Sequence, residues 1–219
     1  MLIAPPEPVT DPQLKPYYQK DGITIYNGDC AEVLPKLGQF DLLLTDPPYG
    51  IATIWKGGAG GASSWKIPAS KTHEWDGETP DAAIAESLQH TENAIIWGGN
   101  YYSLPPMRGW LVFDKALPDT FTIGCCELAW TSLDQPIKRL TIPHVQATKG
   151  KIHPTQKPLA LMRWCLGFVP DATTILDPFM GSGTTLLAAK LEGRQAVGIE
   201  LSEEYCEIAA NRLAQGVLF

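Results

Sequence analysis

The sequence contains no apolar run that approaches the roughly 20 residues needed to cross a bilayer. Its first 16 residues carry five prolines, and they lack the basic and apolar blocks of a signal peptide. These absences indicate a cytoplasmic protein without a membrane contact. We expect residues 1–20 to be a poorly ordered N-terminal segment.

Cysteine is scarce, and its spacing does not suit a metal site. The five cysteines are an odd number, and none of them lie two residues apart, as the pairs of common zinc sites do. This spacing also argues against a disulfide framework. We interpret the cysteines as free thiols buried in a reducing compartment, and we expect no metal.

Acidic residues are absent from Gln135 to Pro170, a stretch that holds six lysines and arginines. From Asp171 onward acids predominate, and the whole chain has a net charge of −7, which argues mildly against a nucleic-acid partner. The asymmetry is typical of a protein with one face toward a polyanion and a solvated back. A chance basic run on a surface loop explains it equally well.

The apolar runs predict alternating strands and helices. In the last third, a strand at 173–176, a helix at 184–191 and a strand at 195–200 are joined by short links, which implies parallel strands. An apolar run from Phe40 to Leu44 predicts another buried strand, ended by prolines. Further strands are expected at 23–26, 94–97, 110–113 and 127–131, and helices at 31–37, 81–89, 158–168 and from Ser202 onward. The 219 residues then fit one α/β domain over 21–219.

A glycine-containing turn follows the predicted strand at 173–176 and reads Asp177-Pro178-Phe179-Met180-Gly181-Ser182-Gly183-Thr184-Thr185. The glycines allow a close approach of backbone to a ligand. The turn is neither a phosphate-binding Walker loop nor the dinucleotide fingerprint. Asp177 is suited to a ligand ammonium group and Glu200, which ends the next strand, to two ribose hydroxyls. S-adenosylmethionine offers both groups, so the pattern favours this cofactor over a purely structural turn.

A second turn, Asp46-Pro47-Pro48-Tyr49, ends the strand at 40–44. The exocyclic amine of a nucleobase is a poor nucleophile until its two hydrogens are bound by acceptors. Asp46 supplies a carboxylate oxygen for one hydrogen, and the rigid proline pair directs the carbonyl of Pro47 toward the other. Tyr49 offers a flat face for a flipped-out base. Taken alone, the tetrapeptide is equally explained as a plain strand-ending turn.

Together these motifs resemble the permuted β group of DNA amino-methyltransferases, in which the catalytic motif precedes the cofactor motif. The resemblance rests on four ordered segments, Leu44-Thr45-Asp46-Pro47-Pro48-Tyr49-Gly50, His153-Pro154-Thr155-Gln156-Lys157-Pro158, Leu176 through Thr185, and Gly198-Ile199-Glu200. The segments Trp97 to Tyr101 and Trp110 to Lys115 are similar to small phage and prophage members. The resemblance implies the Rossmann-like α/β methyltransferase fold, a mostly parallel, circularly permuted seven-stranded sheet with a reversed hairpin.

The resemblance also implies a set of site residues. Asp46, Pro47, Pro48 and Tyr49 would be catalytic. Asp29 would bind the adenine of the cofactor, and Lys157 would help to hold its methionine end, although a phosphate contact or a solvated lysine explains Lys157 too. The full set of expected cofactor contacts is Asp29, Cys30, Asp46, Thr155, Gln156, Lys157, Asp177, Pro178, Phe179, Gly181, Ser182, Gly183, Thr184, Thr185 and Glu200.

Members of the group with Asp before Pro-Pro-Tyr mostly methylate N6 of adenine, whereas members with Ser there mostly methylate N4 of cytosine. Asp46 therefore favours adenine N6. Methylation of cytosine N4 or of RNA, and a non-catalytic nucleic-acid-binding protein, are the alternatives. Transfer to a protein glutamine is a weaker one, because that family usually carries Asn in place of Asp46.

The expected partner is double-stranded DNA, and the resemblance leaves room for a homodimer and a cognate restriction nuclease in a bacterial or phage-infected cell. Little chain remains to read a DNA sequence. We assign target recognition to a long loop at 51–75 and an irregular segment at 134–152. Lys56, Lys66, Lys71 and Arg139 are the candidate phosphate contacts in these regions.

Overall fold

The computed structural model describes residues 14–50, 79–118, 120–121, 124–148 and 156–215, which build one nine-stranded sheet in the order β1-β2-β9-β8-β3-β4-β6-β5-β7. The strands are β1 (Tyr18–Lys20), β2 (Ile23–Asn27), β3 (Phe40–Thr45), β4 (Thr91–Trp97), β5 (Trp110–Asp114), β6 (Cys126–Thr131), β7 (Lys138–Thr141), β8 (Thr174–Asp177) and β9 (Gln195–Glu200). The helices are α1 (Cys30–Val33), the 3-10 turn η1 (Leu34–Lys36), α3 (Asp81–Gln89), α4 (His144–Thr148), α5 (Leu159–Leu166), α6 (Thr184–Leu191) and α7 (Glu203–Ala214).

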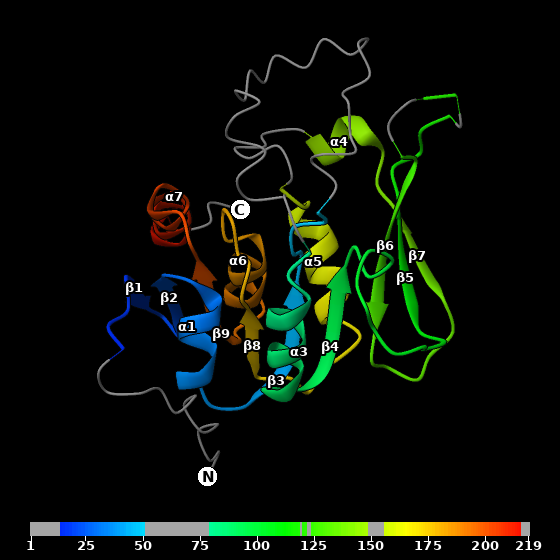
Figure 1. Ribbon diagram of the computed structural model, residues 1–219. Helices are drawn as coiled ribbons and strands as arrows, with labels where there is room; N and C mark the ends of the chain where they lie inside the picture. Colours follow the sequence, from blue (N-terminus) through cyan, green and yellow to red (C-terminus); the bar gives the residue numbers. More distant parts are fainter. Residues whose placement is uncertain (1–13, 51–78, 119, 122–123, 149–155, 216–219) are drawn as a thin grey trace.

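Five strands in the centre, β2, β9, β8, β3 and β4, run parallel, and β6 runs antiparallel to both of its neighbours (Figure 1). The predicted α/β class with a mostly parallel sheet and a reversed strand is therefore confirmed. β2 from the start of the chain pairs with β9 from its end, as the expected permutation requires. The seven inner strands of the sheet, in the order β2-β9-β8-β3-β4-β6-β5, correspond to the seven that were expected. The short strands β1 and β7 are added at the two edges, so the described residues form nine.

Both faces of the sheet are covered, because its strands are apolar on both sides, as buried parallel strands are. One core packs α5, α6 and α7 against strand residues such as Leu42 and Ile175. The other packs α1, η1 and α3 against the alternate residues, among them Leu43 and Leu176. Within the residues described, no helix is long and apolar enough to span a bilayer.

Two sequence predictions need correction at the edges of the sheet. Residues 18–20 were expected to be poorly ordered, but they form β1, because Asp21 and Gly22 both adopt positive φ (51° and 77°) and close a tight hairpin. The 134–152 segment was expected to be irregular, but it contains β7 and α4. β7 is polar and only four residues long, so its own sequence does not indicate a strand. Its pairing with β5 stabilises the extended conformation.

Asp41 ties the first residues of β3 to the start of β8. Its Oδ2 accepts hydrogen bonds from the Thr173 and Thr174 amides (2.6 and 2.9 Å) and from Thr173 Oγ1 (2.8 Å). Partial burial raises the pKa of Asp41, but these hydrogen bonds outweigh it and hold that pKa below its usual value. The link fixes the pairing of the two strands whose other ends carry the predicted motifs.

Asp41→Ala should lower the free energy of unfolding by about 1–3 kcal/mol at neutral pH, because three donors lose a shared acceptor. Since the folded-state pKa is depressed, the contribution is present above the unfolded pKa and is lost as the pH falls through the folded pKa. Urea unfolding at several pH values measures both effects. Asp134→Ala, which removes an exposed ion pair with Arg108, is the control and should cost far less. Equal costs for the two variants would contradict this role of Asp41.

Candidate active site

The two motifs singled out in the sequence lie side by side. β3 and β8 are parallel neighbours, with Leu43 opposite Leu176, so their carboxyl ends reach the same edge of the sheet. There Thr45 Oγ1 donates a hydrogen bond of 2.7 Å to Asp177 Oδ1. Asp46 follows Thr45, so the Asp-Pro-Pro-Tyr turn and the glycine turn start from one junction.

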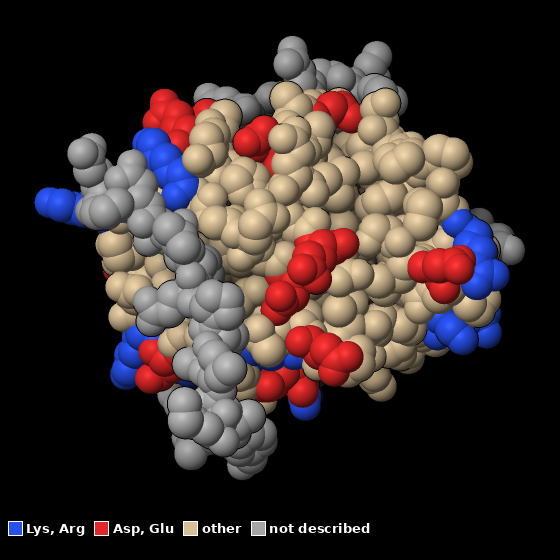
Figure 2. Space-filling model, turned by 90° about the horizontal axis from the view of Figure 1, so that it is seen from below, with Lys and Arg blue, Asp and Glu red and all other residues tan. Residues whose placement is uncertain are grey.

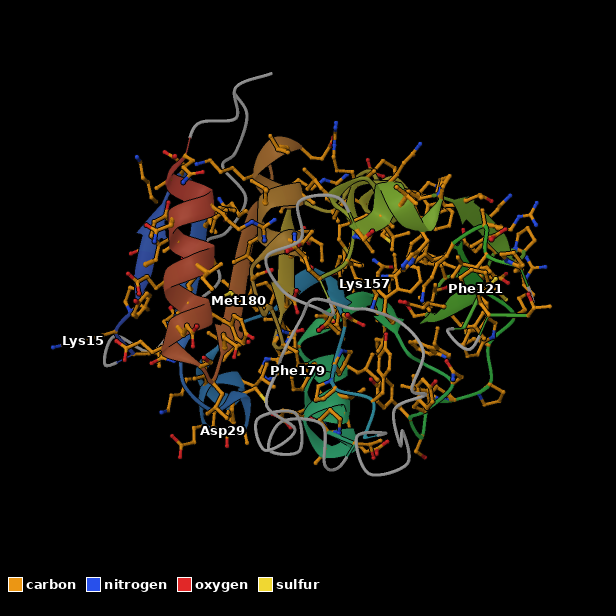
Figure 3. All side chains as sticks on the ribbon, turned by 90° about the horizontal axis from the view of Figure 1, so that it is seen from above. Lys15, Asp29, Phe121, Lys157, Phe179 and Met180 are labelled. Carbon is orange, nitrogen blue, oxygen red and sulfur yellow. The ribbon has the colours of Figure 1, made fainter. Side chains whose placement is uncertain are left out.

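An open pocket at this edge joins both turns. Most of the predicted cofactor contacts line it, together with Met162 and Met180, which the sequence did not indicate; the lining is Asp46, Gln156, Lys157, Met162, Asp177, Phe179, Met180, Gly181, Ser182, Thr184 and Thr185. Figure 3 looks onto this edge and shows Phe179 between Lys157 on one side and Asp29 on the other, with Met180 nearby. The turns therefore do form one cavity.

The two glycines of the glycine turn, Gly181 and Gly183, have different roles. Both have positive φ, +51° at Gly181 and +75° at Gly183. A Cβ on Gly183 would lie 2.8 Å from the Cβ of Ala209, so this glycine permits packing against α7 rather than contact with a ligand. A Cβ on Gly181 would meet no described atom within 4 Å, and Gly181 lines the pocket. Only Gly181 has the place that the sequence analysis expected of both.

Asp177, Glu200 and Asp29 stand at the ends of three adjacent strands. Asp177 is 3% exposed, and burial raises its pKa to about 6 against hydrogen bonds from Thr185 and Thr45. Glu200 accepts from the Gly181 amide (3.1 Å) and the Ser202 amide (2.8 Å), which holds it against the glycine turn. Asp29 caps α1 by accepting from the Ala31 amide (2.9 Å). The three carboxylates thus follow the carboxyl edge from β8 to β2.

The remaining predicted residues divide into three groups. Pro178 belongs to the glycine turn, and Cys30 begins α1 next to Asp29; neither lines the pocket. Arg139 lies on edge strand β7, 69% exposed and 3.7 Å from Asp114, so the structure does not bring it to the pocket. Thr155, Lys56, Lys66, Lys71 and the loop at 51–75 lie outside the described residues.

Lys157 contacts Asp46, the carboxylate of the Asp-Pro-Pro-Tyr turn. Its Nζ donates to Asp46 Oδ2 (2.6 Å) and to the hydroxyl of Tyr49 (2.9 Å), while that hydroxyl donates to Asp46 Oδ1 (2.7 Å). With only 7% of its side chain exposed, Lys157 is not a solvated lysine. It lines the pocket between the two turns, and its closest anionic partner is Asp46.

Glu127 on β6 completes the cluster, and the sequence analysis missed it. Its carboxylate forms ion pairs with Lys157 (3.0 Å) and with Lys115 (2.7 Å), which follows β5. The available indication was an acid inside the otherwise uncharged strand Cys126–Thr131. A strand acid that faces the interior needs cationic partners, and these come from segments far away in the sequence.

The cluster keeps its charges despite burial. Burial lowers the pKa of Lys157, but Asp46 and Glu127 hold that pKa well above its usual value. Burial raises the pKa of Glu127, but Lys157 and Lys115 outweigh it and bring that pKa to about 2. Burial also raises the pKa of Asp46, and Lys157 opposes the rise without cancelling it. Lys157 and Glu127 are therefore ionised at neutral pH, and Asp46 is the more basic of the two carboxylates.

The segment after β4 positions the Asp-Pro-Pro-Tyr turn. The hydroxyl of Tyr102 donates to the carbonyl oxygen of Pro47 (2.8 Å), and the ring of Tyr101 stacks on Tyr49 with centroids 5.0 Å apart. Gly98 has a φ of +73°, and a Cβ there would lie 2.3 Å from Tyr49 Cε1. The role of the Trp97 to Tyr101 segment was left open by the sequence. In the structure this segment packs against the Asp-Pro-Pro-Tyr turn and supports it.

Comparisons with known proteins agree with this arrangement. A family model described as DNA methylase matches residues 64–211. The Type II methyltransferase M2.DpnII of Streptococcus pneumoniae is 49% identical over 248 residues, which cover 91% of this chain and 92% of that protein. The Type II methyltransferase M.ScaI of Streptomyces caespitosus is 28% identical over 255 residues, covering 91% and 84%.

Solved structures share the fold. The complex of M1.HpyAVI with SAM superimposes with a TM-score of 0.56 at 22% identity and covers 88% of this chain and 100% of that one. The PvuII DNA methyltransferase (cytosine-N4-specific) gives a TM-score of 0.61 at 14% identity, with coverage of 94% and 92%. The family match and the relative at 49% identity extend over most of the chain, and we conclude that it belongs to the DNA methylase family of N6 and N4 amino-methyltransferases.

Proposed function

We propose that this DNA methyltransferase transfers a methyl group from S-adenosylmethionine to the exocyclic N6 of a flipped-out adenine. The observation that carries the proposal is that Asp46 lines the same pocket as Asp177 and directly follows β3, the strand that is paired with β8. The acceptor of an amine hydrogen and the binding site of a methyl donor are then one site. Aspartate at this position of the family motif supports adenine rather than cytosine.

The residues of the pocket fit S-adenosylmethionine. The buried carboxylate of Asp177, which lines the pocket, suits the ammonium of the methionine end. Glu200 is not among the residues that line the pocket, but it ends the neighbouring strand β9 and contacts the Gly181 amide, where it suits the two ribose hydroxyls. The open space at Gly181 lets the ligand lie against backbone. Once bound, the cofactor supplies an electrophilic methyl group on a positively charged sulfur.

The chain's own residues would activate the target amine. Asp46 accepts one amine hydrogen and the carbonyl of Pro47 the other, which directs the nitrogen lone pair out of the ring plane and toward the methyl group. In the structure the Tyr49 hydroxyl binds Asp46 Oδ1, and Tyr102 binds the Pro47 oxygen. Each of these two oxygens has a further lone pair, so it can accept an amine hydrogen in addition to the tyrosine hydroxyl. At Asp46 the amine hydrogen can also take the place of the Tyr49 hydroxyl.

The opposite edge of the sheet does not suit DNA. Figure 2 views the molecule from that side and shows acidic side chains across its middle, with most lysines and arginines near the rim. Phosphates are repelled by such a face, so DNA would approach the pocket edge. The named relatives are Type II methyltransferases, which supports a restriction–modification setting. A cognate nuclease, a homodimer and the DNA contact of Arg139 stay predictions.

DNA from a host that expresses this protein should contain N6-methyladenine, detected by mass spectrometry of its nucleosides. Asp46→Ala should reduce methyl transfer at least about a hundredfold, because it removes an acceptor from the transition state. Calorimetry should show that the variant still binds S-adenosylmethionine, and Asp134→Ala should behave as the parent. Detection of N4-methylcytosine instead would show that the target is cytosine. If the protein binds nucleic acid but the host DNA contains neither methylated base, the proposed methyl transfer is contradicted.

Cofactor affinity should fall as the pH is lowered from 7 to 5. An ammonium needs the ionised form of Asp177, whose pKa is about 6, so affinity should drop roughly tenfold per pH unit below that value. Calorimetric titrations across this range give the slope. Asp177→Asn should bind weakly at every pH, without loss of thermal stability at neutral pH, since it removes a costly buried charge. A pH-independent affinity in the parent protein would contradict this role.

Tyr102→Phe should lower kcat by about tenfold, the effect of one hydrogen bond on the barrier, because the Pro47 carbonyl loses the group that orients it. The KM for S-adenosylmethionine should change little, because Tyr102 does not line the pocket. Steady-state kinetics on unmethylated genomic DNA measure both. Tyr18→Phe is a matched control, since the Tyr18 hydroxyl has no hydrogen-bond partner among the described residues. An equal effect of the two substitutions would count against the orienting role.

A further inference from the structure

Glu127 belongs to neither of the turns that form the site. It lies on β6, the reversed strand, opposite Phe113 of β5 and three places from β8 in the sheet order. Its carboxylate reaches Lys115 with Oε1 (2.7 Å) and Lys157 with Oε2 (3.0 Å). An acid that pairs with one buried lysine, Lys157, and one partly buried lysine, Lys115, on a strand close to the site calls for a chemical role.

Lys157 connects Glu127 to Asp46 in the Asp-Pro-Pro-Tyr turn. Its ammonium donates hydrogen bonds to Asp46 Oδ2 (2.6 Å) and to the Tyr49 hydroxyl (2.9 Å), and it forms an ion pair with Glu127 Oε2 at 3.0 Å. A cation shared between two carboxylates attracts each of them less than a cation paired with one. Without Glu127, the whole attraction of Lys157 would fall on Asp46.

We propose that Glu127 is a positioning residue that holds Lys157 between two carboxylates and so keeps Asp46 available as the acceptor of the target amine. The inference rests on the proposed function, since it concerns the same acceptor. A carboxylate whose lone pairs are fully engaged by an ammonium is a poor acceptor for a neutral amine. Glu127 reduces that engagement and still leaves Lys157 to offset part of the cost of burying Asp46.

The hairpin of β5 and β6 sets the position of both Glu127 and its second cation. Lys115 follows Asp114, the last residue of β5, and its amide donates to the Cys125 carbonyl (2.9 Å) just before β6. Lys115 and Glu127 therefore move as one unit with the hairpin. Two cations and two carboxylates balance, and the phenol of Tyr49 stays neutral because burial holds its pKa well above the usual value.

The groups that influence the ionisation of Asp46 come from every side of the site. Tyr49 belongs to its own turn, Lys157 precedes α5, Glu127 and Lys115 come from the hairpin, and Asp177 ends β8. Glu127 raises the pKa of Asp46, while Lys157 lowers it. Loss of Glu127 should therefore shift the ionisation of Asp46 in a different direction from loss of either lysine, which a merely structural residue would not do.

The test is the pH profile of kcat for methyl transfer to unmethylated genomic DNA. Glu127→Gln keeps the shape of the side chain, and we expect its acid limb to move to lower pH by up to about one unit. We expect the plateau to fall several-fold, while the KM for S-adenosylmethionine is kept. Lys115→Gln should move the acid limb to higher pH, because Lys157 is then drawn toward Glu127 and Asp46 loses a nearby cation. This second variant decides the matter if Glu127→Gln does not fold.

Two further variants test whether the effect is specific to Glu127 and whether it acts through Lys157. Glu192→Gln removes the same charge from an ion pair with Arg163 outside the site and should leave the profile unchanged. In a Lys157→Gln background, Glu127→Gln should cost much less in kcat than it does alone, because Glu127 acts through Lys157. Equal costs in the two backgrounds would overturn the inference.

The outcomes separate this inference from the proposed function. An active parent protein whose acid limb does not move in Glu127→Gln, or moves the same way in Glu127→Gln and Lys115→Gln, overturns the role of Glu127 and leaves the proposed function standing. A parent protein that binds S-adenosylmethionine but transfers no methyl group to DNA overturns both. Opposite shifts in the two variants, with an unchanged Glu192→Gln profile, support the inference.

Discussion

The ammonium of Lys157 lies 2.6 Å from Asp46 Oδ2 and 3.0 Å from Glu127 Oε2, at the carboxyl edge of the sheet. Removing charges from water is costly, and their mutual attraction offsets that cost only where the geometry is good and every hydrogen has an acceptor. Here three segments meet at one point: the turn after β3, which carries Asp46, the reversed strand β6, which carries Glu127, and the segment before α5, which carries Lys157. The position of the acceptor thus depends on this ion pair.

The order of the strands explains how Asp46, the proposed acceptor, and Asp177, the proposed contact of the methyl donor, come to line one pocket. β3 and β8 are neighbours in the middle of the sheet although 132 residues separate Thr45 from Asp177. Their parallel direction places both turns at one edge, where ligands of open α/β sheets bind. The Thr45 to Asp177 hydrogen bond joins the turns. β2, from the start of the chain, pairs with β9, from its end, so the carboxylates of Asp29 and Glu200 follow neighbouring strands.

The turns could be predicted from the sequence because their signals are local. A buried apolar run that stops at Asp-Pro-Pro, and a strand, glycine turn and helix in succession, each indicate where a strand ends. The partners across the sheet could not be predicted in this way. Glu127 is a lone acid in a strand, and only the pairing of β6 with β4 shows that it faces Lys157. Gly183 was assigned to the ligand, whereas its neighbour is Ala209 of α7, a contact that chain order does not indicate.

The central claim is that Asp46 and the methyl donor occupy one site. A crystal structure of the protein with S-adenosylmethionine tests it most directly. The account predicts the ammonium end at Asp177, the ribose at Glu200 and the sulfur-bound methyl group facing the side of Asp46 that is not covered by Lys157. A cofactor bound with its methyl group turned away from Asp46, or bound elsewhere on the chain, would contradict the account.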